Sequence, residues 1–134
     1  MIQTGKSEIR LGKLELEIMK VVWQQGSATV QEVLEEISKG RKCAYSTILT
    51  MMRKLEAKGY LAHEVRERTF VYKAQVSKGQ VRQGVLGDVL ERLFEGSPSL
   101  LLASLVEQKQ INEEEMAEVR RVISEYGEKK RVIQ

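Results

Sequence analysis

The sequence lacks most of the residues that support covalent or metal chemistry. Its 134 residues include one cysteine (Cys43), one histidine (His63) and one proline. A single cysteine cannot form an intrachain disulfide or a zinc site of several thiolates. No nucleophile–base–acid set, phosphate-binding loop or cluster of metal-ligating residues is recognisable. We therefore predict that the protein is not an enzyme and that it uses no metal and no cofactor.

Long apolar runs are also missing. Leu100–Ala103 is among the longest, which is far short of the roughly 18 residues of a membrane span. Residues 1–10 contain no hydrophobic signal core. Together with the scarcity of cysteine, these absences predict a soluble, cytoplasmic protein that does not insert into a membrane.

Positive charge is concentrated in one part of the chain. The formal net charge is +3, with +4 on residues 1–75 and −1 on residues 76–134. Residues 39–58 contain one acid, Glu56, and six bases. Such an excess suits the release of counterions from DNA, although a solvated helix face is the alternative explanation. The six bases are Lys39, Arg41, Lys42, Arg53, Lys54 and Lys58.

The helix predicted between Ala44 and Gly59 has two chemically different faces. Apolar residues recur at the i, i+3, i+4, i+7 spacing, at Ile48, Met51, Met52 and Leu55. A rotation of about 100° per residue places hydroxyl and cationic side chains on the other side. A helix of this kind suits the major groove of DNA. The polar residues are Ser46, Thr50 and Arg53, flanked by Thr47 and Lys54.

The elements around this helix complete a winged helix-turn-helix over residues 11–75. Helices are predicted from Lys13 to Gln25 and after a capping box at Thr29–Glu32. Two β-patterned runs, 60–65 and 69–73, predict a hairpin. Arg66 and Arg68 lie at or near its tip, where cations reach phosphates. DNA binding is therefore the leading hypothesis.

Residues 76–127 are predicted to form further helices. Their apolar faces are too extensive for such short helices to bury alone, which favours a two-fold homodimer over folding back on the winged helix. The predicted fold class is mainly α with a small β-hairpin wing. We expect residues 1–10 to form a flexible arm, and residues 128–134 a flexible tail after Gly127 ends the last helix. The dimerisation residues would be Val89, Leu93, Phe94, Leu101, Leu102, Leu105, Val119 and Ile123.

Two other functions compete with this hypothesis. A winged-helix protein-interaction module would have an apolar or acidic third helix, whereas the predicted one is basic and rich in hydroxyls. A regulator that responds to a small ligand would need an effector pocket, for which the sequence has no signature.

Four motifs stand out along the chain: LELEIMKVVW (14–23), TVQEV (29–33), STILTMMRKLEAKGYL (46–61) and RTFVYKA (68–74). Together they resemble the penicillinase-repressor (BlaI/MecI) family of winged-helix transcriptional repressors. The resemblance covers about residues 11–126 and is strongest up to residue 74. The combination of T-I-x-T-M, L-x-x-K-G and F-V-Y is more specific than a general winged-helix pattern.

The resemblance implies a homodimeric repressor on a palindromic double-stranded DNA operator, with a role in antibiotic resistance. The matching DNA-binding positions are Tyr45, Ser46, Thr47 and Thr50 on the helix, and Arg66 and Arg68 in the wing. Lys42, Arg53 and Lys54 are added from the basic cluster. The family is inactivated by a signal-activated protease, commonly a membrane sensor, and the matching bond is Ser104–Leu105.

Overall fold

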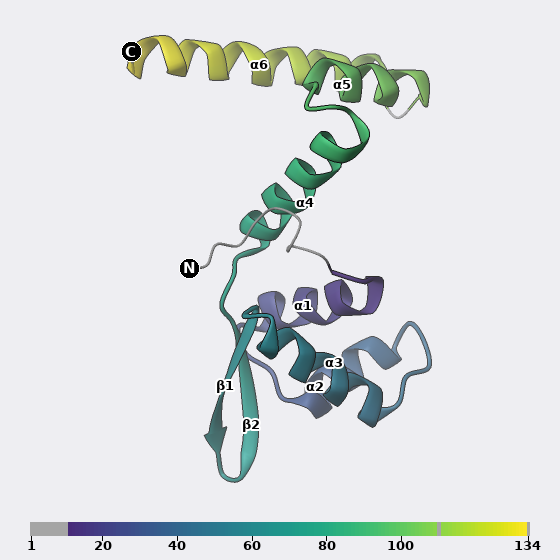
Figure 1. Cartoon of the computed structure of the whole chain (residues 1–134), viewed down its shortest axis with the longest axis vertical. Helices are drawn as coiled ribbons and strands as arrows, with labels where there is room; N and C mark the ends of the chain where they lie inside the picture. The colour runs from purple at the N-terminus through teal and green to yellow at the C-terminus, as the bar shows by residue number, and fades with distance from the viewer. Residues whose placement is uncertain (1–10, 110, 134) are drawn as a thin grey trace. The chain divides into compact units, whose positions relative to one another are not determined.

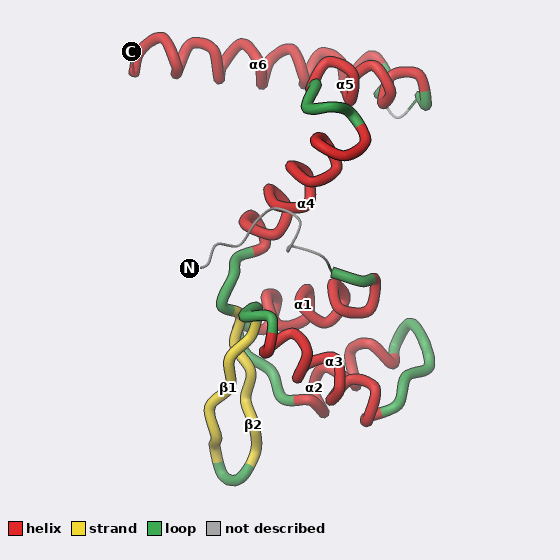
Figure 2. The backbone as a smooth tube through the Cα atoms, viewed as in Figure 1, coloured by secondary structure: helices red, strands yellow, loops and turns green. Residues whose placement is uncertain are grey.

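The computed structural model describes residues 11–109 and 111–133, and the arm predicted for residues 1–10 lies outside them. The described part contains six helices and a two-stranded sheet (Figure 1; Figure 2), which confirms the predicted fold class. It divides into two units, one ending at Asp88 and the other beginning at Val89. The elements are α1 (Lys13–Gln25), α2 (Val30–Ser38), α3 (Tyr45–Ala57), β1 (Leu61–Arg66), β2 (Thr69–Ala74), α4 (Lys78–Leu93), α5 (Pro98–Glu107) and α6 (Glu113–Ile133).

The core of the first unit forms where α1, α2 and α3 meet the base of the hairpin. Ile18 and Val22 of α1 and Ile48 and Leu55 of α3 have no exposed surface. Full burial of a side chain of this size contributes roughly 1.5–3 kcal/mol, so these apolar stripes hold the three helices together. The other core members are Met19, Ala28, Val30, Val33, Ile37, Met52, Tyr60, Leu61 and Tyr72.

The ends of the first helices follow the signals in the sequence. Thr29 accepts a hydrogen bond from the backbone of Glu32 at 3.1 Å, and the Glu32 carboxylate accepts one from the backbone of Thr29 at 2.9 Å. This reciprocal pair satisfies amide groups that the start of α2 would leave without partners. Gly26, with φ 87°, ends α1 in a conformation that favours glycine. The predicted boundaries of α1 and the start of α2 are thereby confirmed.

The hairpin begins and ends within one residue of the predicted limits. Arg66 pairs with Thr69, so the connecting turn consists of Glu67 and Arg68. Their φ values are 51° and 69°, the left-handed region that a two-residue hairpin turn requires and that Asn-Gly adopts most easily. The hairpin is also joined to the segment before α2, because Ala28 and Tyr72 exchange backbone hydrogen bonds of 3.0 and 2.8 Å.

The second unit shares α4 with the first and adds α5 and α6. Ser97 caps α5 by accepting a hydrogen bond from the Leu100 amide at 3.1 Å, and Asn112 caps α6 by accepting one from Glu115 at 2.8 Å. Each cap provides a partner for an amide group that the first turn of the helix would otherwise leave unpaired. After Val81, however, no side chain in the described part of the chain is buried. Packing within the unit therefore leaves its apolar faces open.

The last helix is longer than predicted. We expected Gly127 to end it, but α6 continues through this residue to Ile133, so that prediction is wrong. A glycine inside a helix costs up to about 1 kcal/mol relative to alanine, which weakens a helix without ending it. The backbone of α6 thus extends into the segment predicted to be a flexible tail.

Candidate nucleic-acid interface

The outer face of α3 carries the polar residues predicted for DNA contact. Their side chains are exposed, whereas Ile48, Met52 and Leu55 on the inner face are fully buried. This separation follows from the helical repeat, because side chains three and four positions apart share a face. The exposed positions on α3 are Tyr45, Ser46, Thr47, Thr50, Arg53 and Lys54, and Lys42 is exposed just before the helix.

The two wing arginines differ in their surroundings. Arg66 donates a hydrogen bond to Glu64 at 2.9 Å, and Lys73 lies 3.2 Å from the same carboxylate. These hydrogen bonds, from Lys73 first and then Arg66, hold the pKa of Glu64 below its usual range. Arg68, at the turn, forms no ion pair with any described residue. Arg68 is therefore the wing cation whose charge is free to meet a phosphate.

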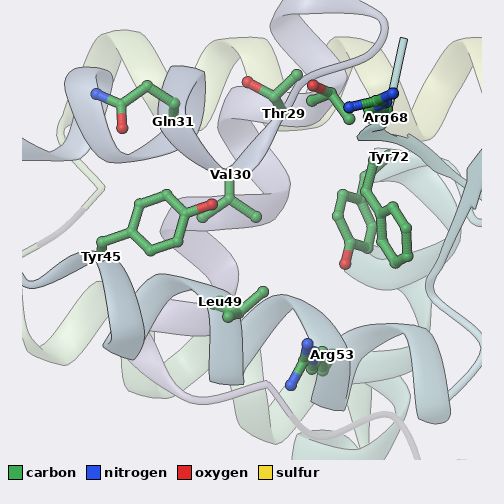
Figure 3. Close-up of a pocket in the computed structure, with 10 residues that line it drawn as sticks. Thr29, Val30, Gln31, Tyr45, Leu49, Arg53, Arg68 and Tyr72 are labelled. Atoms are coloured by element: carbon green, nitrogen blue, oxygen red, sulfur yellow. The ribbon is translucent and has the colours of Figure 1, made fainter. Parts of the chain in front are cut away.

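An open cleft of about 470 Å³ lies between α3, the start of α2 and the wing. Figure 3 shows Arg68 and Arg53 on opposite sides of Tyr72. Arg53, like Arg68, forms no ion pair within the described part of the chain. Two guanidinium groups without carboxylate partners can bind an anionic backbone, to which they donate in a planar fork. The lining residues are Thr29, Val30, Gln31, Tyr45, Leu49, Arg53, Arg68, Thr69, Phe70 and Tyr72.

The inner wall of this cleft contains a buried phenol. Tyr72 has no exposed surface, and its hydroxyl has no hydrogen-bond partner among the described residues. Burial raises the pKa of this phenol, and the nearby charge of Glu56 raises it further. Tyr72 therefore stays neutral, and its buried ring supports the wall of the cleft from behind.

The structure brings only some of the predicted DNA-binding residues into the cleft. Tyr45, Arg53 and Arg68 line it, whereas Ser46, Thr47 and Thr50 lie on the exposed face of α3 outside it. Sequence reasoning missed the contributions of Gln31 and Phe70. Phe70 carried one usable signal, since it is an aromatic residue placed close to the hairpin tip and is 41% exposed.

The residues predicted for dimerisation are all at least partly exposed in the single chain. Leu93 is 71% exposed and Ile123 is 60% exposed, and Leu102 and Leu105 are exposed as well. Ser104 and Leu105 lie inside α5, where the Ser104 hydroxyl donates to the Leu100 carbonyl at 3.0 Å. The partly exposed members are Val89, Phe94, Leu101 and Val119.

Residues 11–109 and 111–133 contain neither a metal-binding cluster nor a membrane-spanning helix. No group of three or more His, Cys, Asp or Glu side chains in this part of the chain is arranged to hold a metal ion. None of its helices combines the length and the apolar character needed to cross a lipid bilayer.

The sequence profile of the penicillinase repressor family matches residues 11–125. The chain belongs to this family. The penicillinase repressor of Bacillus licheniformis is 30% identical to it, over 91% of this chain and 95% of that protein. The methicillin resistance regulatory protein MecI of Mammaliicoccus sciuri is 22% identical, over 85% and 93%. The solution structure of monomeric BlaI from B. licheniformis with the blaP half-operator is 37% identical, covers 52% of this chain and 85% of that chain, and has a TM-score of 0.47.

Membership of the penicillinase repressor family confirms the resemblance inferred from the motifs. This penicillinase repressor homologue is a DNA-binding transcriptional repressor and not an enzyme. The names of its relatives connect the family to the regulation of antibiotic resistance. The polar face of α3 and the wing are accordingly the surfaces to consider for contact with DNA.

Proposed function

We propose that this penicillinase repressor homologue acts in the cytoplasm as a homodimer on a palindromic operator. Each copy inserts α3 into the major groove and places its wing beside the neighbouring phosphates. The observation that carries the proposal is the chemical division of α3, with Ile48, Met52 and Leu55 buried and the hydroxyl and cationic side chains exposed. A basic, hydroxyl-rich third helix favours DNA binding over a protein-interaction module, whose third helix would be apolar or acidic.

The residues on α3 have two different tasks in this proposal. Ser46, Thr47 and Thr50 lie in the first half of the helix, which reaches deepest into the groove, so they contact base edges. Lys42, Arg53 and Lys54 bind phosphates and fix the register of the protein on the duplex. Tyr45 contacts the sugar-phosphate backbone from the cleft, and Arg66 and Arg68 do so from the wing.

The open apolar faces of the second unit support the homodimer. Leu93 and Ile123 are large apolar side chains that are more than half exposed. Apolar surface of this kind, continued along three helices, marks an association surface. A two-fold dimer covers the same face on both copies at once and places two α3 helices on two half-sites about one helical turn apart.

The test separates backbone contacts from base contacts. Arg66→Gln combined with Arg68→Gln should weaken binding to specific and random duplexes alike, and each lost phosphate contact should reduce the salt slope by about one. Thr47→Ala should instead reduce the preference for the specific sequence, with a change of about 1–3 kcal/mol at one base pair. Binding is measured by fluorescence anisotropy over a range of salt concentrations.

A matched control removes a charge away from this surface. Lys20 of α1 is exposed and forms no ion pair within the described residues, so Lys20→Gln should leave affinity and salt slope nearly unchanged. If the arginine and threonine variants behaved like Lys20→Gln, the assignment of α3 and the wing to DNA would be wrong.

We also propose that a signal-activated protease inactivates the repressor by cutting the Ser104–Leu105 bond. This bond lies inside α5, so the helix must open before the chain fits an extended protease site. No side chain of α5 is buried in the single chain, so the helix opens at little cost once the apolar faces of the two copies separate. Mass spectrometry of the repressor from induced cells should detect a fragment ending at Ser104, and an intact chain during full induction would contradict this mechanism.

A further inference from the structure

A three-residue chain of contacts links α3 to the wing. His63 of β1 places Nδ1 2.8 and 2.9 Å from the two carboxylate oxygens of Glu56, which belongs to the last turn of α3. His63 also stacks on Phe70 of β2, with the two ring centroids 3.9 Å apart and an interplanar angle of 9°. The Glu56 and His63 side chains are 32% and 28% exposed, so the pair is partly shielded from water.

These contacts lie at the boundary between the buried base of the hairpin and its exposed outer half. Leu61, Val71 and Tyr72 at the base of the wing are buried, but residues 64–70 are all exposed. The outer half of the hairpin is therefore held by its own strand pairing, by the stack of Phe70 on His63 and by a tilted contact of Phe70 with Tyr72 at 6.2 Å. Phe70 lines the cleft together with Arg53 and Arg68. A shift of His63 would thus change the width of the cleft.

We propose that Glu56 and His63 are positioning residues that set the distance between the DNA-reading face of α3 and Arg68 at the wing tip. The inference rests on the proposed function, in which α3 and the wing contact the same duplex. A specific site offers its base edges and phosphates at fixed spacing, so a pre-positioned wing binds it without a further loss of conformational freedom. Random DNA requires only that a cation lies near a phosphate. Loss of the link should therefore reduce specific binding more than random binding.

The experiment compares two affinities of the full-length protein at one salt concentration. One probe is the duplex that the wild-type protein enriches from a random-sequence pool, and the other is a scrambled duplex of the same length. Glu56→Ala removes the carboxylate, and His63→Phe removes Nδ1 while keeping a ring to stack on Phe70. Each variant should lower the ratio of specific to random affinity about threefold to tenfold, the size expected for one lost hydrogen bond.

Two further variants distinguish a positioning role from general damage. The combined Glu56→Ala, His63→Phe protein should be no worse than either single variant, because both break the same contact. Glu56→Gln retains an oxygen that accepts a hydrogen bond from Nδ1, so it should restore most of the ratio. Thermal unfolding of each protein establishes that the variants are folded at the temperature of the binding measurements.

Glu64→Ala is the matched control for the change in charge. Glu64 follows His63 in β1 and also carries a carboxylate. Its ion pairs are with Arg66 and Lys73 of the wing and not with residues of α3. Its removal takes away a negative charge and frees Arg66 for phosphate, so it should raise the affinity for both duplexes and leave their ratio unchanged. If Glu56→Ala and His63→Phe change the ratio no more than Glu64→Ala does, the positioning role is overturned.

The failure of this inference is distinguishable from the failure of the proposed function. A wild-type protein that binds no duplex at low salt, or enriches no sequence from the pool, contradicts both. A wild-type protein that enriches a sequence while the Glu56 and His63 variants keep its full preference contradicts the positioning role alone.

Discussion

The two units of this chain bury their apolar residues differently. In the first unit, Ile18, Ile48 and Leu55 have no exposed surface. In the second unit, Leu93 is 71% and Ile123 60% exposed. Both units contain amphipathic helices with well-formed caps, so the difference lies in packing rather than in helix formation. The first unit therefore has its own core, whereas the second leaves its apolar faces open to another surface.

The largest expected effect comes from placing charge on the open faces of the second unit. Leu93→Glu combined with Ile123→Glu should convert a dimer into monomers, because a buried carboxylate without a partner is very costly at an apolar interface. Sedimentation velocity measures the change. Affinity for a palindromic duplex should fall about 100-fold, since the second half-site is no longer bound intramolecularly.

The control introduces a glutamate at a similarly exposed apolar residue of the first unit. Val65 is 59% exposed on the wing, and Val65→Glu should leave the sedimentation coefficient unchanged. A wild-type protein that sediments as a monomer at micromolar concentration would remove the basis of the comparison, because the open faces would then need no partner copy.

The stabilities of the two units should depend differently on protein concentration. Leu55→Ala leaves a cavity in the core of the first unit and should lower its free energy of unfolding by roughly 2–5 kcal/mol at every protein concentration. Leu93→Ala should lower stability in a manner that depends on protein concentration, because the proposed dimer buries this side chain only on association. Urea unfolding at two concentrations tests this, and an identical concentration dependence for both variants would contradict it.

A smaller effect concerns the buried carboxylate of the first unit. Glu15 accepts hydrogen bonds from the Gly12 amide at 2.9 Å and from Lys58 Nζ at 3.0 Å. Burial alone would raise its pKa, but these two partners outweigh burial and leave the pKa of Glu15 below its usual value of 4.5. Glu15→Gln should therefore destabilise the unit by roughly 1–2 kcal/mol at pH 7.

The sign of this effect follows from linkage. A lowered pKa means that the folded state holds the ionised carboxylate more favourably than the unfolded state does, so the stabilisation is complete above pH 4.5 and is lost as the pH falls through the folded-state value. The difference between wild type and Glu15→Gln should accordingly shrink in acid. A difference that stays constant from pH 7 to pH 3 would show that the ionised form is not what stabilises the unit.

The sequence was most informative where a local rule determines the structure. The apolar spacing of Ile48, Met52 and Leu55 defined the buried face of α3, and the Thr29–Glu32 pair marked the start of α2. Both rules act within one helical turn, so no knowledge of distant segments was needed.

Features that depend on distant segments could not be predicted in the same way. The cleft requires Gln31 of α2 and Phe70 of β2 to approach α3, and nothing in their local sequence specifies that approach. The sequence gives no sign of the contact between His63 and Glu56, because this contact exists only after the hairpin has folded against α3. Gly127 is the opposite case, since a residue that often ends helices lies inside a helix that continues past it.

The turn at Glu67 and Arg68 has a consequence for attempts to engineer this repressor. Both residues adopt a backbone conformation that asparagine and glycine would occupy with less strain. A screen for thermal stability alone would therefore favour asparagine or glycine at these positions. It would remove the guanidinium of Arg68, which lines the cleft and forms no ion pair with any described residue. Variants selected only for thermal stability are expected to bind DNA more weakly, so such a screen has to be combined with a selection for DNA binding.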